Sequence, residues 1–153
     1  MEIFMEKKKE NPDILFLQDI YKSVSLRSEL LTAVLEKTGN DELKEALSAA
    51  IDTCAGFAAR AKQSLEKLSV QAKEPGMLEK IPSEISVRAS MLTDHCTSKI
   101  AEFIIEGAVS GTGEYKEKIR EADTAGVSLE NIRLAGDVLA FHEGMINKMR
   151  PYL

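Results

Sequence analysis

The chain has 153 residues, of which 44% are hydrophobic and 29% are charged, a composition typical of globular rather than disordered proteins. Its net charge of -5 argues against nucleic acid as a partner, and no stretch approaches the ~20 apolar residues of a membrane helix. Aromatic residues make up only 5% of the chain, which favours helices over strands. We therefore expect one all-α domain that binds neither nucleic acid nor a membrane.

The first twelve residues form an expected flexible, charged N-terminus, and residues 13–153 form the expected domain. The basic run Lys7-Lys8-Lys9 is flanked by Glu6 and Glu10, so its local charge is largely cancelled. No apolar signal core precedes the domain, and a cytoplasmic location is therefore expected. In that reducing compartment the two cysteines, Cys54 and Cys96, are interpreted as small core residues rather than a disulfide.

The first two predicted helices span residues 13–38 and 41–68. Apolar residues recur in each at spacings of three and four, which places them on one face: Leu17, Ile20, Tyr21, Val24, Leu31, Val34 and Leu35 in the first, and Leu43, Leu47, Ala50, Ile51, Cys54, Phe57, Ala58, Ala61, Leu65 and Leu68 in the second. Gly39 ends the first helix and Asn40 caps the second. Such a short connection predicts antiparallel packing.

The segment 69–83 contains Pro75, Gly76 and Pro82, and it either crosses one end of the bundle or forms a loose hairpin. The third predicted helix runs from Ser83 to about Glu121 with Cys96 facing inward. We expect it to continue through Gly107 and Gly111, because glycines four residues apart suit a close helix crossing. The sequence Asp123-Thr124-Ala125-Gly126 ends that helix.

The fourth predicted helix begins near Ser128, carries His142 on its apolar face and stops at Pro151. Four helices joined by short turns and one longer link predict an antiparallel up-down-up-down four-helix bundle.

A di-iron bundle requires inward glutamates and, on two helices, a histidine three residues after a glutamate. The histidines here are His95 and His142, and the residues three positions before them are Leu92 and Leu139. We therefore expect no catalytic residues and no resident cofactor.

A degenerate transition-metal site remains an alternative. It would be built from His95, His142, Glu102 and Glu29, with the histidines on neighbouring helices. The competing interpretation makes His142 a buried structural side chain. Histidine phosphotransfer is disfavoured, because the residues after His95 lack the expected lysine-glycine pair.

Two stretches are similar to a known family: Leu92-Thr93-Asp94 and Thr97-Ser98-Lys99-Ile100-Ala101-Glu102, followed by Gly107, Gly111 and a terminal Tyr152-Leu153. The chain resembles bacterial ferritin-like four-helix-bundle proteins of unknown function, mainly from Met91 onward. The resemblance implies a ferritin-like fold and a bacterial cytosolic protein, and it transfers no catalytic residue.

The leading functional hypothesis is a non-enzymatic structural or protein-interaction module that forms a homodimer through its long helices. The first alternative is the metal-binding protein with the degenerate site around His95 and His142. A second alternative is a regulatory bundle that takes up an amphipathic partner helix, with Met145 and Met149 lining the groove.

Overall fold

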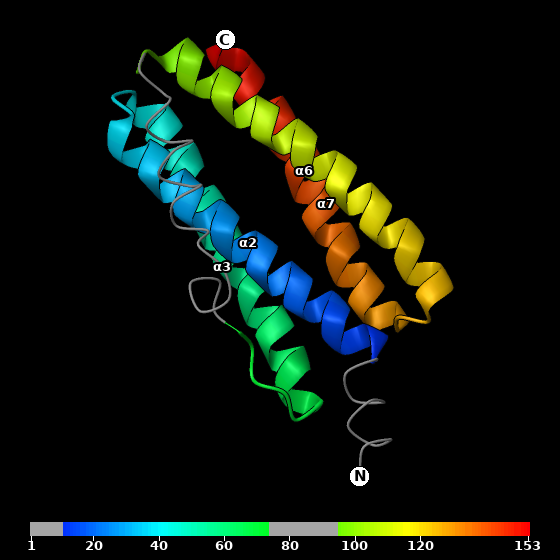
Figure 1. Cartoon of the computed structure of the whole chain (residues 1–153). Helices are drawn as coiled ribbons and strands as arrows, with labels where there is room; N and C mark the ends of the chain where they lie inside the picture. The colour runs from blue at the N-terminus through cyan, green and yellow to red at the C-terminus, as the bar shows by residue number, and fades with distance from the viewer. Residues whose placement is uncertain (1–10, 74–94) are drawn as a thin grey trace.

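The computed structural model of the chain describes residues 11–73 and 95–153 (Figure 1). This part of the chain contains α2 (Pro12–Lys37), α3 (Asp41–Lys67), α6 (Thr97–Ala125), α7 (Leu129–Met149) and the short 3-10 helix η1 (Arg150–Tyr152). The described residues include no strand, and the predicted all-α class with four long helices is confirmed. None of the described helices is long and apolar enough to cross a membrane.

The ends of the helices follow from local chemistry. The side chain of Asn11 accepts hydrogen bonds from the backbone N–H groups of Asp13 and Ile14, so α2 begins at Pro12. The side chain of Asn40 accepts from the backbone N–H of Leu43 and caps α3, as predicted. Gly126 ends α6 with φ of 81°, a left-handed conformation that glycine adopts without strain. The N-terminal residues 1–10 lie outside the described part of the chain.

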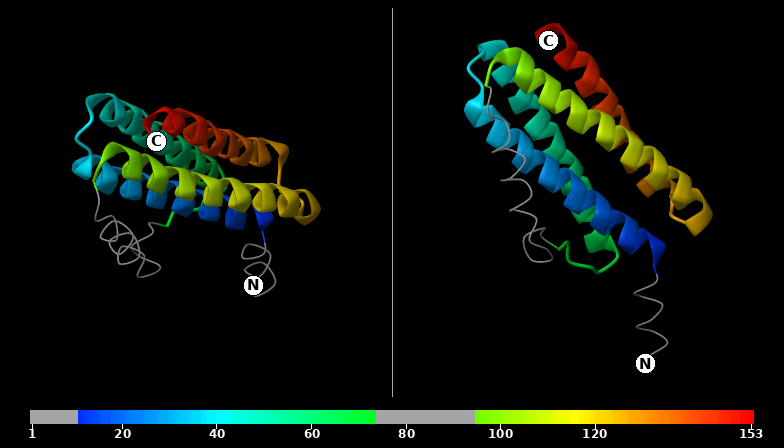
Figure 2. Two further views of the ribbon diagram at one scale, coloured as in Figure 1. Left: turned by 90° about the horizontal axis from the view of Figure 1, so that it is seen from above. Right: turned by 45° about the horizontal axis from the view of Figure 1, so that its top comes forward.

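Two helical hairpins pack against each other. The chain reverses direction between α2 and α3 and again between α6 and α7, and each turn is only three residues long (Figure 1). The two views in Figure 2 place α2 beside α6 and α3 beside α7, in agreement with the contacts between these helices. The bundle therefore has α2, α3, α7 and α6 in that order around its axis.

Contacts between distant residues fix the direction of each helix. The Asp13 carboxylate accepts from the backbone N–H of Ser128 at 2.9 Å, so the α6–α7 turn lies at the N-terminal end of α2. The Gln18 side chain accepts from the backbone N–H of Lys73 at 3.1 Å, so the end of α3 lies there too. Helices α3 and α6 therefore both end at this end of the bundle and run in the same direction.

The predicted up-down-up-down sequence of helix directions is wrong, because α6 runs in the same direction as α3. The observed directions of the four helices along the chain are up, down, down and up. The short turns 38–40 and 126–128 force each hairpin to reverse, but the longer segment between α3 and α6 imposes no reversal. The two alternatives for residues 69–83, and the predicted helix start at Ser83, fall mostly on residues 74–94, outside the described part. In the described residues, the third long helix, α6, begins at Thr97.

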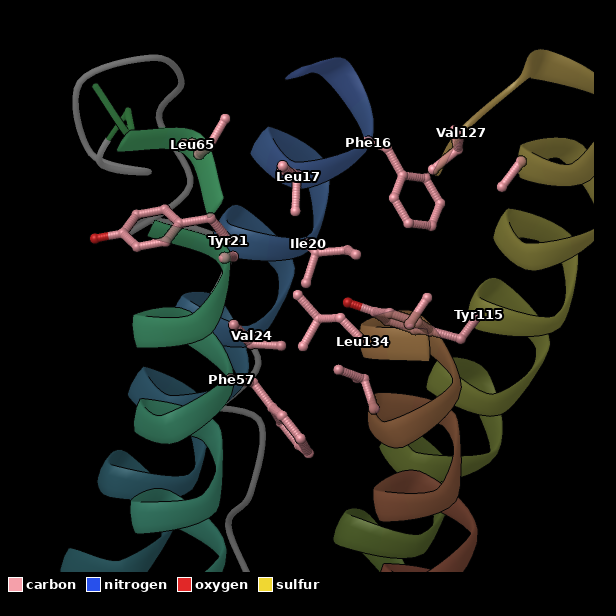
Figure 3. Close-up of a cluster of buried hydrophobic side chains, with 14 residues drawn as sticks. Phe16, Leu17, Ile20, Tyr21, Val24, Phe57, Leu65, Tyr115, Val127 and Leu134 are labelled. Atoms are coloured by element: carbon pink, nitrogen blue, oxygen red, sulfur yellow. The ribbon is translucent and has the colours of Figure 1, made fainter. Parts of the chain in front are cut away.

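Buried apolar side chains form two groups along the bundle. One lies around the N-terminal half of α2 and includes Leu17, Ile20, Leu65 and Leu134 (Figure 3). The other lies around the C-terminal half of α2 and is built on Val34, Leu47, Ile100, Met145 and Met149. The predicted inward faces of the helices account for most of these residues. Phe141 packs against both groups.

Candidate functional site

Five side chains from all four helices define the central polar cluster: Ser23 and Arg27 from α2, Cys54 from α3, Tyr115 from α6 and His142 from α7. Tyr115 is fully buried, Cys54 is 1% exposed and His142 is 3% exposed. The rings of Tyr115 and His142 lie with their centroids 5.6 Å apart. Ser23 and Arg27 are half-buried at the edge of this cluster.

Two hydrogen bonds tie the central polar cluster to its surroundings. The Tyr115 hydroxyl donates to Ser23 Oγ at 3.0 Å and joins α6 to α2. The Arg27 guanidinium donates from Nη2 to the backbone oxygen of Gly107 at 3.2 Å and joins the same helices. The Tyr115 side chain is fully buried, so its bond to Ser23 satisfies a hydroxyl that would be costly to leave without a partner.

The glycines of α6 make room for the central polar cluster. A Cβ atom on Gly111 would lie 2.7 Å from the His142 ring, and one on Gly107 would lie 2.7 Å from Arg27 Nη1. The sequence correctly predicted a continuous helix through both glycines. However, their nearest neighbours are side chains rather than the backbone of a crossing helix, so the physical reason for the glycines is different.

Burial sets the protonation of the cluster. Desolvation, assisted by the positive charge of Arg27, lowers the pKa of His142 from 6.5 to about 4, so its imidazole is neutral at pH 7. Burial raises the pKa of the Cys54 thiol to about 11, against the opposing effect of Arg27, so this cysteine is protonated. Burial also raises the pKa of Tyr115, and its hydroxyl remains a hydrogen-bond donor.

The residues of the predicted metal site do not converge. His142 is buried, whereas His95, Glu29 and Glu102 are exposed. His95 precedes the first residue of α6, and His142 packs against Gly111, which at 1.5 Å per helical residue places them roughly 20 Å apart along the bundle. In residues 11–73 and 95–153, no group of three or more histidine, cysteine or acidic side chains is placed to hold a metal ion.

The structure also corrects the interpretation of Cys96. It was expected in the core of a helix that began at Ser83, but it is exposed and occupies the N-cap position of α6 without a side-chain capping hydrogen bond. Its sulfur lies 3.5 Å from Ser98 Oγ. Cys54 does occupy the core, and both cysteines are free thiols.

Sequence reasoning missed Arg27 and Tyr115 as neighbours of His142, and Ser23 as the acceptor of the Tyr115 hydroxyl. A signal for Arg27 was present, because it continues the inward series Ile20, Val24, then Leu31 and Val34, at the same spacings of four and three. A charged residue at a core position of an apolar stripe is unusual and indicates a buried polar contact.

Replacing Tyr115 with phenylalanine is expected to lower the free energy of unfolding by about 1 kcal/mol, because it removes the bond to Ser23 while keeping the packed ring. Chemical denaturation of the variant measures this loss. In the matched control Tyr152→Phe, at a half-buried position near the C-terminus, we expect a change below about 0.5 kcal/mol. Equal losses in the two variants would contradict a specific role for the Tyr115 hydroxyl.

The described helices define an all-α, four-helix protein with a polar centre enclosed by apolar side chains. No family model matches the chain, and no curated protein matches it. Among solved structures, the fold is similar to YcfI from Rhodopseudomonas palustris, described as "a putative structural protein", with a TM-score of 0.69 and 17% sequence identity over 89% of each chain. At this identity the likeness shows the fold alone.

Proposed function

We propose that the protein is a non-enzymatic, antiparallel ferritin-like bundle that serves as a structural or protein-interaction module in the bacterial cytoplasm. The observation that carries this proposal is the composition of the bundle centre. A di-iron bundle directs glutamates inward from its helices, whereas this centre contains Arg27, a neutral His142 and the Tyr115–Ser23 hydrogen bond. The two glutamates considered as ligands, Glu29 and Glu102, are exposed.

The ferritin-like part of the proposal is supported by the helix directions. Ferritin-like bundles combine short turns with one long crossover connection. A long crossover makes the second and third helices run in the same direction. Helices α3 and α6, which are the second and third long helices here, do run in the same direction. The description of YcfI as a structural protein is compatible with the proposed role.

The proposed interaction partner is a second copy of this chain. The outer face of α6 offers a contact surface, because Val109 is 55% exposed and the space around Gly113, four residues further, is open. Gly107 and Gly111 in the same helix face inward to Arg27 and His142 and do not contribute to this surface.

Two measurements on the full chain test this proposal. Elemental analysis of protein purified without added metal is expected to give far less than one iron, manganese or zinc per chain. A stoichiometric metal that is lost in His142→Ala would contradict the non-metal centre.

Light scattering is expected to give the mass of a dimer, which Val109→Glu reduces to that of one chain of 16.9 kDa. A wild-type monomer at high concentration would overturn the homodimer.

A further inference from the structure

An outer stripe of exposed residues runs along most of α6. Its members recur at alternating spacings of three and four, so they lie on the same side of the helix. Val109 is the one apolar side chain among them, and it is 55% exposed. The outer stripe consists of Glu102, Glu106, Val109, Gly113, Lys116 and Arg120.

The charges of the outer stripe are complementary about the middle of the helix. Gly111 is the middle residue of α6 (Thr97–Ala125). The pairs of positions equally far from Gly111 are Glu102 and Arg120, Glu106 and Lys116, and Val109 and Gly113, so each acidic residue corresponds to a basic one. The dipole of a helix acts only on its first and last turns. It does not account for the charges of Glu106 and Lys116, which lie outside both of these turns.

An antiparallel pair of α6 helices brings these opposite charges together. A two-fold axis at the level of Gly111 places each residue of the outer stripe opposite the residue equally far on the other side of Gly111 in the second copy. Glu106 then faces Lys116 of the partner subunit, and Val109 faces Gly113 of the partner subunit. A parallel pair in the same alignment instead places Glu106 opposite Glu106 of the partner subunit, and the like charges repel.

Glu106 and Lys116 are free of competing ion pairs. Both side chains are exposed, and no ion pair joins either of them to another residue in the described part of the chain. Glu102 and Arg120 differ in this respect, because they hold exposed partners within their own chain, Lys99 and Glu117 respectively. The electrostatic preference for the antiparallel pair is therefore carried by Glu106 and Lys116.

We propose that a second copy of this chain docks along the outer stripe with its own α6 antiparallel, and that contacts between Glu106 and Lys116 of the partner subunit set this alignment. The inference rests on the proposed homodimer and specifies how its two copies are aligned. Complementary charges across an interface fix the register and disfavour other alignments. Between the charged contacts, Gly113 has open space where a Cβ atom would lie, so Val109 of the other copy can approach the backbone closely.

Charge exchange between two variants of the full chain tests this alignment, and light scattering over a range of protein concentrations gives each dimer Kd. Glu106→Lys and Lys116→Glu are each expected to raise the Kd about tenfold, because each change turns two attractive contacts per dimer into repulsive ones. An equimolar mixture of the two variants is expected to restore the wild-type Kd, since every contact in the mixed dimer again joins opposite charges. The two positions lie roughly 15 Å apart along one helix, so the recovery comes from contacts between copies.

Glu45→Lys is the matched control, because it makes the same charge reversal at an exposed position on α3 and should keep the wild-type Kd. The double variant Glu106→Lys with Lys116→Glu keeps the net charge of -5 and should also dimerise like the wild type. If the wild type is a dimer but both single variants keep its Kd, or their mixture fails to recover it, the antiparallel alignment is overturned and the homodimer stands. A wild-type monomer at every concentration would overturn the homodimer and the alignment together.

Discussion

Gly111→Ala is expected to lower the free energy of unfolding by about 1–2 kcal/mol, even though alanine is the better helix former. A Cβ atom at this position would lie 2.7 Å from both Cε1 and Nε2 of His142. The ring itself is enclosed by Tyr115 and Phe141, with centroid separations of 5.6 and 5.5 Å, so it has little freedom to move away. The steric cost therefore exceeds the gain of about 1 kcal/mol in helix propensity.

The matched control for this prediction is Gly113→Ala in the same helix. No atom lies within 4 Å of the position of its Cβ, so we expect an increase in stability of about 0.5–1 kcal/mol. Urea unfolding of both variants gives the comparison. A double variant, Gly111→Ala with His142→Ala, should lose less stability than the sum of the two single changes, because the overlapping ring is gone. Strict additivity would show that the His142 ring is not the obstacle.

Acidification is expected to destabilise the fold through His142. The folded-state pKa of about 4 lies below the ordinary value of 6.5, so the unfolded chain binds the proton more readily. The stability contributed by the neutral ring is fully present above pH 6.5 and is lost progressively as the pH falls toward 4. Between pH 7 and pH 5 the expected loss is about 2 kcal/mol, since each pKa unit corresponds to about 1.4 kcal/mol.

Urea unfolding at several pH values measures this dependence, and His142→Leu identifies its source. Leucine cannot be protonated, so the variant should lose about 2 kcal/mol less than the wild type over the same interval. His95→Gln removes the exposed histidine without touching the central polar cluster and controls for the loss of one histidine. Identical pH profiles for wild type and His142→Leu would refute a buried neutral His142.

The candidate site was only partly predictable from the sequence. His142 was correctly placed on the inward face of its helix, because the spacing of Val138, Met145 and Met149 defines that face. The suggested partners His95, Glu102 and Glu29 do not lie beside His142. The prediction assumed a helix that included His95. It also could not determine which residues of the other helices lie at the level of His142 along the bundle axis. The groups that do surround His142 include Gly111 and Tyr115 on α6 and Arg27 on α2.

The sequence by itself determined the helical class, the caps at Asn40 and Gly126, the apolar faces and the absence of the di-iron motif, because these depend on local spacing and on residue type. Only the tertiary structure decided that α3 and α6 run in the same direction, because contacts such as Asp13 with Ser128 join residues far apart in the chain. It also decided that Gly107 and Gly111 accommodate Arg27 and His142. That close approach depends on how the helices are aligned along the bundle, and spacing within one helix carries no information about this alignment.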